Sequence, residues 1–164
     1  MYTANYFIDK LKLKEHPEGG YYNECIITDN TFDSSCLEGL TGERKLWQSI
    51  YYLLKDRGIS ALHRLNSDEI WYYHSGSPLV IYIFDKDGNL VQKKLGLDVE
   101  RGEMPQVIIH RGEIFGAAMD GTGYSLVGCM TSPGFRFEDY ELMDRTEMIK
   151  KYPQYEQIIK RLTK

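Results

Sequence analysis

The sequence lacks any apolar run that approaches the roughly 20 residues needed to span a bilayer. It also lacks a dense block of lysine or arginine, and its formal net charge is −4, which disfavours nucleic acid or an anionic membrane surface as a partner. The amino terminus does not show the basic, apolar and small-residue order of a secretion signal. We therefore expect a soluble, cytoplasmic protein with no nucleic-acid and no membrane partner.

Cysteine is scarce, which limits how the chain can be stabilised. Cys25, Cys36 and Cys129 are odd in number, widely spaced and in no Cys-x-x-Cys arrangement, so a disulfide framework or a structural zinc knuckle is not expected. We expect free thiols in a reducing compartment. At 164 residues the chain is long enough to bury a substantial core without disulfides, and we expect one domain over residues 1–164.

Aromatic and β-branched residues are abundant, by contrast, and they gather in short runs. The runs that predict strands cover residues 21–27, 50–54, 69–74, 79–84 and 90–94. Turn residues such as Asp87-Gly88-Asn89 separate neighbouring runs. Short strands joined by short turns predict an all-β fold, a closed or nearly closed sandwich or barrel whose interior can hold one small ligand.

Short helices are expected only at the two ends of the chain. Thr3 can cap a helix that runs to about Leu11, and Asp144 with Glu147 forms a capping box for a helix that ends before Pro153, near which a last helix begins. Residues 29–44 are polar and have no sustained period, so we expect a long loop that could cover the mouth of a pocket.

One stretch combines an imidazole and a carboxylate between two glycines. Gly58, His63, Glu69 and Gly76 match positions of the first signature of the cupin superfamily, which this stretch resembles. Leu65 stands at the place of that signature's second histidine. In the second half of the superfamily pattern, Phe115 stands at the ligand position. Two of the four metal ligands that the resemblance implies are therefore apolar here.

Further stretches extend the resemblance over nearly the whole chain. They comprise residues 16–22, 50–54, 63–76, 102–106 and 132–135. Together they are similar to the cupin 5 family of RmlC-like cupins, whose members mostly lack an assigned function. The resemblance implies a double-stranded β-helix, meaning a jelly-roll cupin barrel, commonly assembled as a homodimer.

The candidate catalytic residues are His63, Glu69 and Tyr73. His63 coincides with a cupin ligand position and has an ordinary pKa near 6.5, close to working pH, so it could act as a base or hold a metal. Glu69, Trp71 and Tyr73 should share one face of a strand because side chains alternate with a period of two. We expect a cation, either His63 or Arg64, to keep Glu69 ionised.

The candidate ligand-binding residues lie on that strand and on two other segments. Trp71 offers an aromatic wall, and Gln106 offers a neutral amide. Glu18 and Tyr21 flank a pair of glycines, whose bend lets a ligand approach the backbone closely. His74 falls on the opposite face from Glu69 unless a bulge near Ser75-Gly76 turns it inward.

Three functions remain open at this point. The first is a metal-independent pocket that binds or acts on a small polar, sugar-like metabolite, with no cofactor. The second is a metal-dependent isomerase, lyase or oxygenase, in which His63 and Glu69, helped by His74, His110 or water, hold a divalent ion. The third is a non-catalytic module that recognises a metabolite without transforming it.

Overall fold

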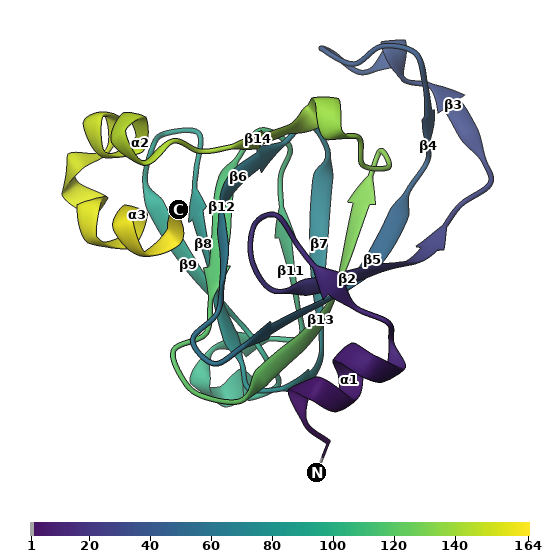
Figure 1. Ribbon diagram of the computed structural model, residues 1–164. Helices are drawn as coiled ribbons and strands as arrows, with labels where there is room; N and C mark the ends of the chain where they lie inside the picture. Colours follow the sequence, from purple (N-terminus) through teal and green to yellow (C-terminus); the bar gives the residue numbers. More distant parts are fainter. Residues whose placement is uncertain (1) are drawn as a thin grey trace.

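The protein is built from two six-stranded β-sheets that enclose a common core (Figure 1). The structure, a computed structural model, describes residues 2–164. The first sheet has the strand order β1-β2-β5-β13-β7-β11, and the second has the order β10-β9-β8-β12-β6-β14. A separate pair, β3 and β4, forms a hairpin outside both sheets. Among residues 2–164 no helix is long and apolar enough to cross a membrane.

The strands of the first sheet are β1 Lys14–Glu15, β2 Tyr21–Ile27, β5 Gln48–Lys55, β7 Asp68–Gly76, β11 Gln106–Ile109 and β13 Tyr124–Ser132. Those of the second are β6 Ile59–Leu65, β8 Leu79–Phe84, β9 Leu90–Leu95, β10 Glu103–Met104, β12 Ile114–Ala118 and β14 Tyr140–Leu142. The outer hairpin is β3 Thr31–Asp33 and β4 Glu43–Lys45, and the helices are α1 Ala4–Lys10, α2 Arg145–Lys151 and α3 Glu156–Leu162.

The core explains why β8 is apolar on both faces. All six residues of Leu79–Phe84 are buried. Ile81 and Ile83 point into the space between the sheets, whereas Val80, Tyr82 and Phe84 pack outward against the helices α2 and α3. A strand covered on both faces loses the alternation of polar and apolar residues that a solvent-facing strand shows. The predicted all-β jelly roll with short helices at both ends is confirmed.

The terminal helices form as their capping residues predict. The Thr3 side chain accepts a hydrogen bond from the Tyr6 amide at 3.2 Å, and Asp144 accepts one from the Glu147 amide at 2.9 Å. Helix α1 packs on the outer side of the first sheet, and α2 with α3 covers the outer side of the second (Figure 1). The helices therefore shield the sheets without entering the space between them.

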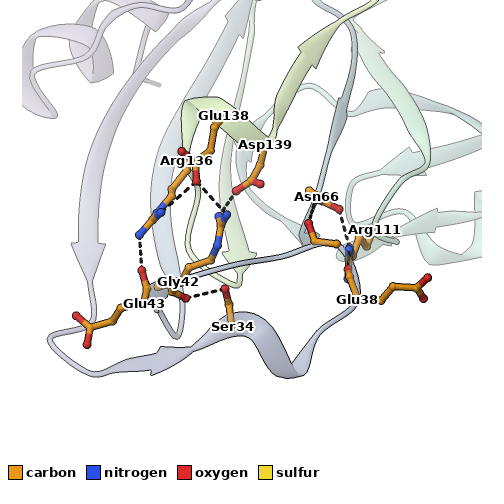
Figure 2. A network of polar contacts seen from close by, with 11 residues as sticks. Ser34, Glu38, Gly42, Glu43, Asn66, Arg111, Arg136, Glu138 and Asp139 are labelled. Atoms are coloured by element: carbon orange, nitrogen blue, oxygen red, sulfur yellow. Dashed lines mark hydrogen bonds and ion pairs between the residues drawn. The ribbon is translucent and has the colours of Figure 1, made fainter.

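The segment 29–44 differs from the expected loop. It contains the hairpin of β3 and β4, which extends away from the barrel as an arm (Figure 1). The arm lines no part of the cavity described below, so the expectation that it covers the mouth directly is wrong. It contacts residues 134–139, the segment that follows β13, and it also accepts hydrogen bonds from Asn66 and Arg111 (Figure 2).

Two arginines hold residues 134–139 against the arm. The buried Arg44 guanidinium pairs with Asp139 and donates to Glu138 at 3.1 Å (Figure 2). Arg136 donates to the Glu43 carbonyl in return and also to Glu138. Charge-assisted hydrogen bonds of this kind fix geometry as well as contributing energy. The arm thus positions a segment that has no strand partner of its own.

Candidate functional site

A cavity of about 230 Å³ lies between the two sheets. Its wall comes mainly from the inward side chains of β2, β5, β6, β7 and β13, from the loop after β1, and from the segment that follows β13. The lining residues are His16, Pro17, Glu18, Tyr22, Glu24, Gln48, Ile50, Tyr52, His63, Leu65, Glu69, Trp71, Cys129, Thr131, Phe135, Arg136, Phe137 and Tyr140.

Glu18 and His63 form the buried polar centre of this wall. Oε2 of Glu18 accepts a hydrogen bond from the Ser60 hydroxyl at 2.9 Å and lies 3.4 Å from Nδ1 of His63. The chain brings Glu18 inside through Gly19, whose φ is +117° and whose added Cβ would lie 2.3 Å from the Ile59 carbonyl oxygen. Only glycine fits so close to a neighbouring strand at that backbone angle.

His63 is neutral and in a defined tautomer at neutral pH. Burial lowers the pKa of His63 to about 4. Its Nδ1 atom lies 2.8 Å from the Ala61 carbonyl oxygen, which can only accept, so Nδ1 carries the hydrogen and donates. The lone pair of the imidazole is therefore on Nε2, which forms no hydrogen bond within residues 2–164.

Four polar atoms of the wall are buried without a hydrogen-bond partner among the described residues. They are Oε2 of Glu69, Nε1 of Trp71, Oγ1 of Thr131 and the hydroxyl of Tyr140. Glu69 and Thr131 face each other directly across the β7–β13 ladder, and Trp71 follows Glu69 on the same face. Buried polar groups are nearly always paired with protein or water, so these four atoms are free to bind whatever polar molecule enters the cavity.

Burial favours the protonated form of both carboxyls, and that of Glu69 more strongly than that of Glu18. Burial raises the pKa of Glu69 to about 8 and that of Glu18 to about 7. The expectation that a cation keeps Glu69 ionised is wrong, because the His63 imidazole is neutral and turns to Glu18. Arg64 points outward, where it pairs with Glu141. Glu69 therefore presents a carboxylic acid to the cavity around pH 7.

Four of the predicted site residues come together here. His63, Glu69, Trp71 and Glu18 all line the cavity, and each is at least nine-tenths buried. They come from β6, from β7 and from the loop before β2, so the fold assembles them from separate segments. The pairing of an imidazole with a carboxyl involves Glu18, however, and not Glu69 as the spacing of the motif had indicated.

Tyr73 and His74 are not in the cavity. The register between β7 and β13 shifts after Tyr73, so that His74 is left without a direct partner and is exposed. This is a bulge, but it turns His74 toward Tyr51 on the outer face, with the rings 6.1 Å apart. Tyr73 keeps the inward face and packs against the core, where its hydroxyl donates to the Gly76 carbonyl beyond the reach of the cavity.

Tyr21 and Gln106 also lie outside the cavity. Tyr21 packs on the outer face of the first sheet beside α1, and its neighbour Tyr22 takes the inward position. Gln106 begins β11 opposite Tyr72 and is exposed, because β11 is the edge strand of its sheet and this residue faces solvent. A period of two assigns residues to two faces without saying which face is inside.

Sequence reasoning missed several residues that line the cavity. His16 precedes Glu18 in the paired-glycine bend, and its Nδ1 lies 3.8 Å from Oε2 of Glu18. Thr131 and Tyr140 lie near the end of β13 and at the start of β14. The strand pattern of β13 could have indicated Thr131, since it lies two residues from Cys129 on one face, but residues 134–140 carry no periodic signal.

The residues at the cupin metal position do not fit a divalent ion. Leu65 and Phe115 offer no donor atom, and the Phe115 ring packs 4.1 Å from the His63 ring, centroid to centroid. His74 and His110, the histidines suggested as substitutes, are both exposed and line no part of the cavity. Across residues 2–164 no group of three or more His, Cys, Asp or Glu side chains could hold a metal.

Comparison with known proteins agrees with this fold. An X-ray crystal structure of a Shewanella oneidensis protein superposes with a TM-score of 0.91 at 43% identity, covering 100% of this chain and 99% of that one. A hypothetical protein from Leishmania major gives a TM-score of 0.89 at 36% identity, with 99% of each chain covered. An uncharacterized protein of Saccharomyces cerevisiae is 27% identical over 155 residues, which span 87% of this chain and 76% of the yeast protein.

The family described as Cupin superfamily (DUF985) matches residues 5–143. That range takes in both six-stranded sheets and every lining residue of the cavity. The chain therefore belongs to this cupin family.

Proposed function

We propose that this protein binds a small polar metabolite in the cavity between its sheets through side chains alone, and that Glu69 is placed to donate a proton to it. The observation that carries the proposal is the set of four unpaired buried polar atoms on Glu69, Trp71, Thr131 and Tyr140. Leaving a buried donor or acceptor unsatisfied costs about 1–3 kcal/mol each. A ligand must therefore pair with these atoms at least as well as the water that it displaces from the cavity.

The protonation states support acid–base chemistry on a bound molecule. A carboxylic acid whose pKa is about 8 holds its proton at pH 7 and can release it to a substrate, which is the state a general acid requires. The free Nε2 of His63 can accept a hydrogen bond or a proton from the same ligand. The combination supports a metal-independent proton transfer better than a reaction on a metal, for which the ligands are missing.

Ligand binding is tested by a fragment screen in solution. The library contains sugars, polyols, small acids and amines, and binding is followed by NMR shift changes and by the rise in melting temperature. We expect saturable binders whose affinity falls in Glu69→Gln and Thr131→Val, and no change in Gln106→Ala, which lies outside the cavity. Hits that bind all four proteins equally would contradict the proposal.

The proton-donating role has its own readout. Any binder is incubated with the wild-type protein in deuterated water, and exchange or isomerisation at its carbon atoms is followed by NMR. Turnover that disappears in Glu69→Gln, with binding retained, supports the acid. Saturable binding with no exchange and no product would leave a non-catalytic binding module in place of an enzyme.

Metal content gives an independent test of the side-chain-only pocket. Protein purified without an affinity tag or chelator is analysed by mass spectrometry of its metals, next to folded His63→Ala and Glu69→Ala variants. We expect far less than one metal ion per chain in all three. A near-stoichiometric metal that is lost in both variants would overturn the proposal and direct the search to oxygenase, isomerase or lyase assays.

We also propose that two copies pair along β2. Ile26 and Ile27, on the outer half of this strand, and Leu46 nearby are exposed apolar residues. β1 pairs with only Tyr21 and Tyr22 of β2, so within residues 2–164 the other positions of the strand have no strand partner on that side. An exposed apolar edge favours association. Light scattering on a sizing column should give a dimer for the wild type and a monomer for Ile26→Lys.

A further inference from the structure

We propose that the cavity selects an organic cation, namely a protonated amine or a quaternary ammonium group. The inference rests on the binding part of the proposed function and specifies the chemical class of its ligand, for which Glu69 is an ionised partner and not a proton donor. It follows from three properties of the wall: the sign of its charges, the absence of a free positive group, and the aromatic rings that surround the acids.

Acidic groups outnumber free basic groups on the wall. Glu18 and Glu69 lie deep in the cavity, and Glu24 is exposed on its rim. Oε2 of Glu69 has no partner, and Glu24 forms no ion pair within residues 2–164. A rim carboxylate attracts cations toward the opening, and a buried unpaired carboxyl oxygen gives the cation a contact inside.

Among the described residues, no free positive side chain lines the cavity. Arg136 is the only lysine or arginine among the lining residues, and its guanidinium is engaged by Glu138 and the Glu43 carbonyl (Figure 2). Burial lowers the pKa of both His16 and His63, so neither imidazole carries a charge at pH 7. An anionic ligand would therefore meet carboxyl groups without a compensating cation.

Two lysines approach the site from outside and are already occupied. Lys14 lies over the outer side of the Tyr22 ring, with Nζ 4.9 Å from its centroid, and Lys164 donates to the Pro17 carbonyl. Neither residue lines the cavity. The Lys14 contact shows that the Tyr22 ring already accepts an ammonium group on one face.

Aromatic rings surround the acids. The inner end has Tyr52 against Trp71, with ring centroids 5.6 Å apart in an edge-to-face arrangement, and the outer end has Phe135 against Phe137 at 5.1 Å. The Tyr140 ring lies 6.3 Å from that of Phe135 and 5.7 Å from that of His63, centroid to centroid. Aromatic faces attract cations through their ring quadrupole, most strongly where water is excluded, and cages of this kind recognise quaternary ammonium groups.

Because Glu18 and Glu69 are at least partly protonated at neutral pH, a cation that binds beside them should release protons, which an uncharged ligand should not do. Glu69 and Glu18 are uncharged or partly so at neutral pH because burial disfavours their ionised forms. A cation placed beside them favours the ionised forms, so its binding should release protons. A sugar or polyol of the same size would satisfy hydrogen bonds but leave both carboxyls protonated.

The test compares two probes that differ only in charge. Choline carries a quaternary nitrogen, and 3,3-dimethylbutan-1-ol has a carbon atom in its place. Titration calorimetry is done at pH 7 in buffers of different ionisation enthalpy, on wild type, on Glu69→Gln, and on Glu15→Gln. Glu15 is an exposed glutamate of β1 that does not line the cavity, so this variant makes the same substitution outside the site.

We expect choline to bind wild type and Glu15→Gln alike, more tightly than its carbon isostere, with protons released to the buffer. Glu69→Gln should weaken choline about 10- to 100-fold and reduce the proton release, while leaving the isostere unchanged. Melting curves confirm that each variant is folded.

Two results would overturn the inference. If the isostere binds as tightly as choline, or Glu69→Gln leaves choline unaffected, the pocket does not select a cation, although it still binds small molecules. If neither probe binds at millimolar concentration, the cation class is excluded as well. In both cases the proposed function is decided separately, by the sugars, polyols and acids of the fragment screen.

Discussion

Nδ1 of His63 lies 3.4 Å from Oε2 of Glu18, and the pair joins the loop before β2 to strand β6. Ser60, which lies on β6 with His63, donates to the same carboxyl oxygen. Near pH 7 the imidazole is neutral and the carboxyl is close to half protonated, because burial lowers the pKa of His63 to about 4 and raises that of Glu18 to about 7. Several consequences of this wall can be measured.

The stability of the protein should fall as pH rises above 6.5. The carboxyls of Glu18 and Glu69 have an ordinary pKa of 4.5, raised in the fold to about 7 and about 8, so the folded state binds more protons than the unfolded state in this range. Each group contributes a slope of up to about 1.4 kcal/mol per pH unit. Below pH 6.5 His63 acts in the opposite direction, since its pKa is lowered.

Urea unfolding between pH 5 and pH 9 measures this slope. The groups that face Glu18 are His16, His63 and Lys164, and Glu18 in turn acts on Glu69. Glu69→Gln should flatten the decline between pH 6.5 and about pH 8. Glu15→Gln should leave it unchanged, and a curve for Glu69→Gln parallel to wild type would show that Glu69 is not the group that titrates.

Removal of an unpaired hydroxyl should weaken ligand binding without destabilising the fold. Oγ1 of Thr131 is buried without a partner, and valine has nearly the same shape, so Thr131→Val should leave the free energy of unfolding unchanged or raise it by about 1 kcal/mol. The contrasting variant is Ser60→Ala, which loses the hydrogen bond to Glu18 and should cost about 1 kcal/mol. Equal destabilisation by both variants, seen in urea unfolding, would mean that Thr131 is paired.

The buried ion pair of the arm should matter far more than an exposed one. The Arg44 side chain is 3% exposed, and Arg44→Met leaves Asp139 buried without its partner, at a cost of about 3 kcal/mol. Arg64, 44% exposed and paired with Glu141, is the matched control, and Arg64→Met should cost less than about 1 kcal/mol. Hydrogen exchange should show faster exchange over residues 134–139 in the Arg44 variant alone. Similar effects of the two substitutions would contradict this view of the arm.

Two glycines with positive φ should respond differently to alanine. Gly42 has φ +76° and nothing within 4 Å of an added Cβ, so Gly42→Ala should cost about 1–3 kcal/mol from backbone strain alone. Gly19 has φ +117° and an added Cβ would meet the Ile59 carbonyl. Gly19→Ala should therefore be the more destabilising of the two and should also move Glu18. Thermal unfolding ranks the variants, and a smaller loss for Gly19→Ala would contradict the close approach.

Much of the barrel could be predicted from sequence because its strands carry strong local patterns. The runs at 21–27 and 79–84 coincide with β2 and β8 in full, and the helix ends follow from Thr3 and Asp144. The motif that contains His63 and Glu69 also placed two cavity residues correctly. These features depend on short-range chemistry, which one sequence contains.

The rest depends on pairing between distant segments. The register of β2 on β5 turns Tyr22, and not Tyr21, toward the cavity. A bulge in β7 opposite β13 moves His74 out of register. The carboxyl beside His63 belongs to Glu18, from a loop that only tertiary packing brings there. The protonation of Glu69 follows from burial depth, a property of the whole barrel.

Residues 134–139 belong to neither sheet, and the arginines of the arm and of the segment itself hold them in place. The part of the cavity wall that Phe135, Arg136 and Phe137 form is therefore held by side-chain contacts and by no strand ladder. Phe135 and Phe137 could be exchanged for smaller or polar residues while the buried Glu18 and Glu69 side chains stay in place. Substitutions in residues 134–139 can thus change the size and hydrophobicity of the molecules that the cavity admits, independently of the buried acids that those molecules contact.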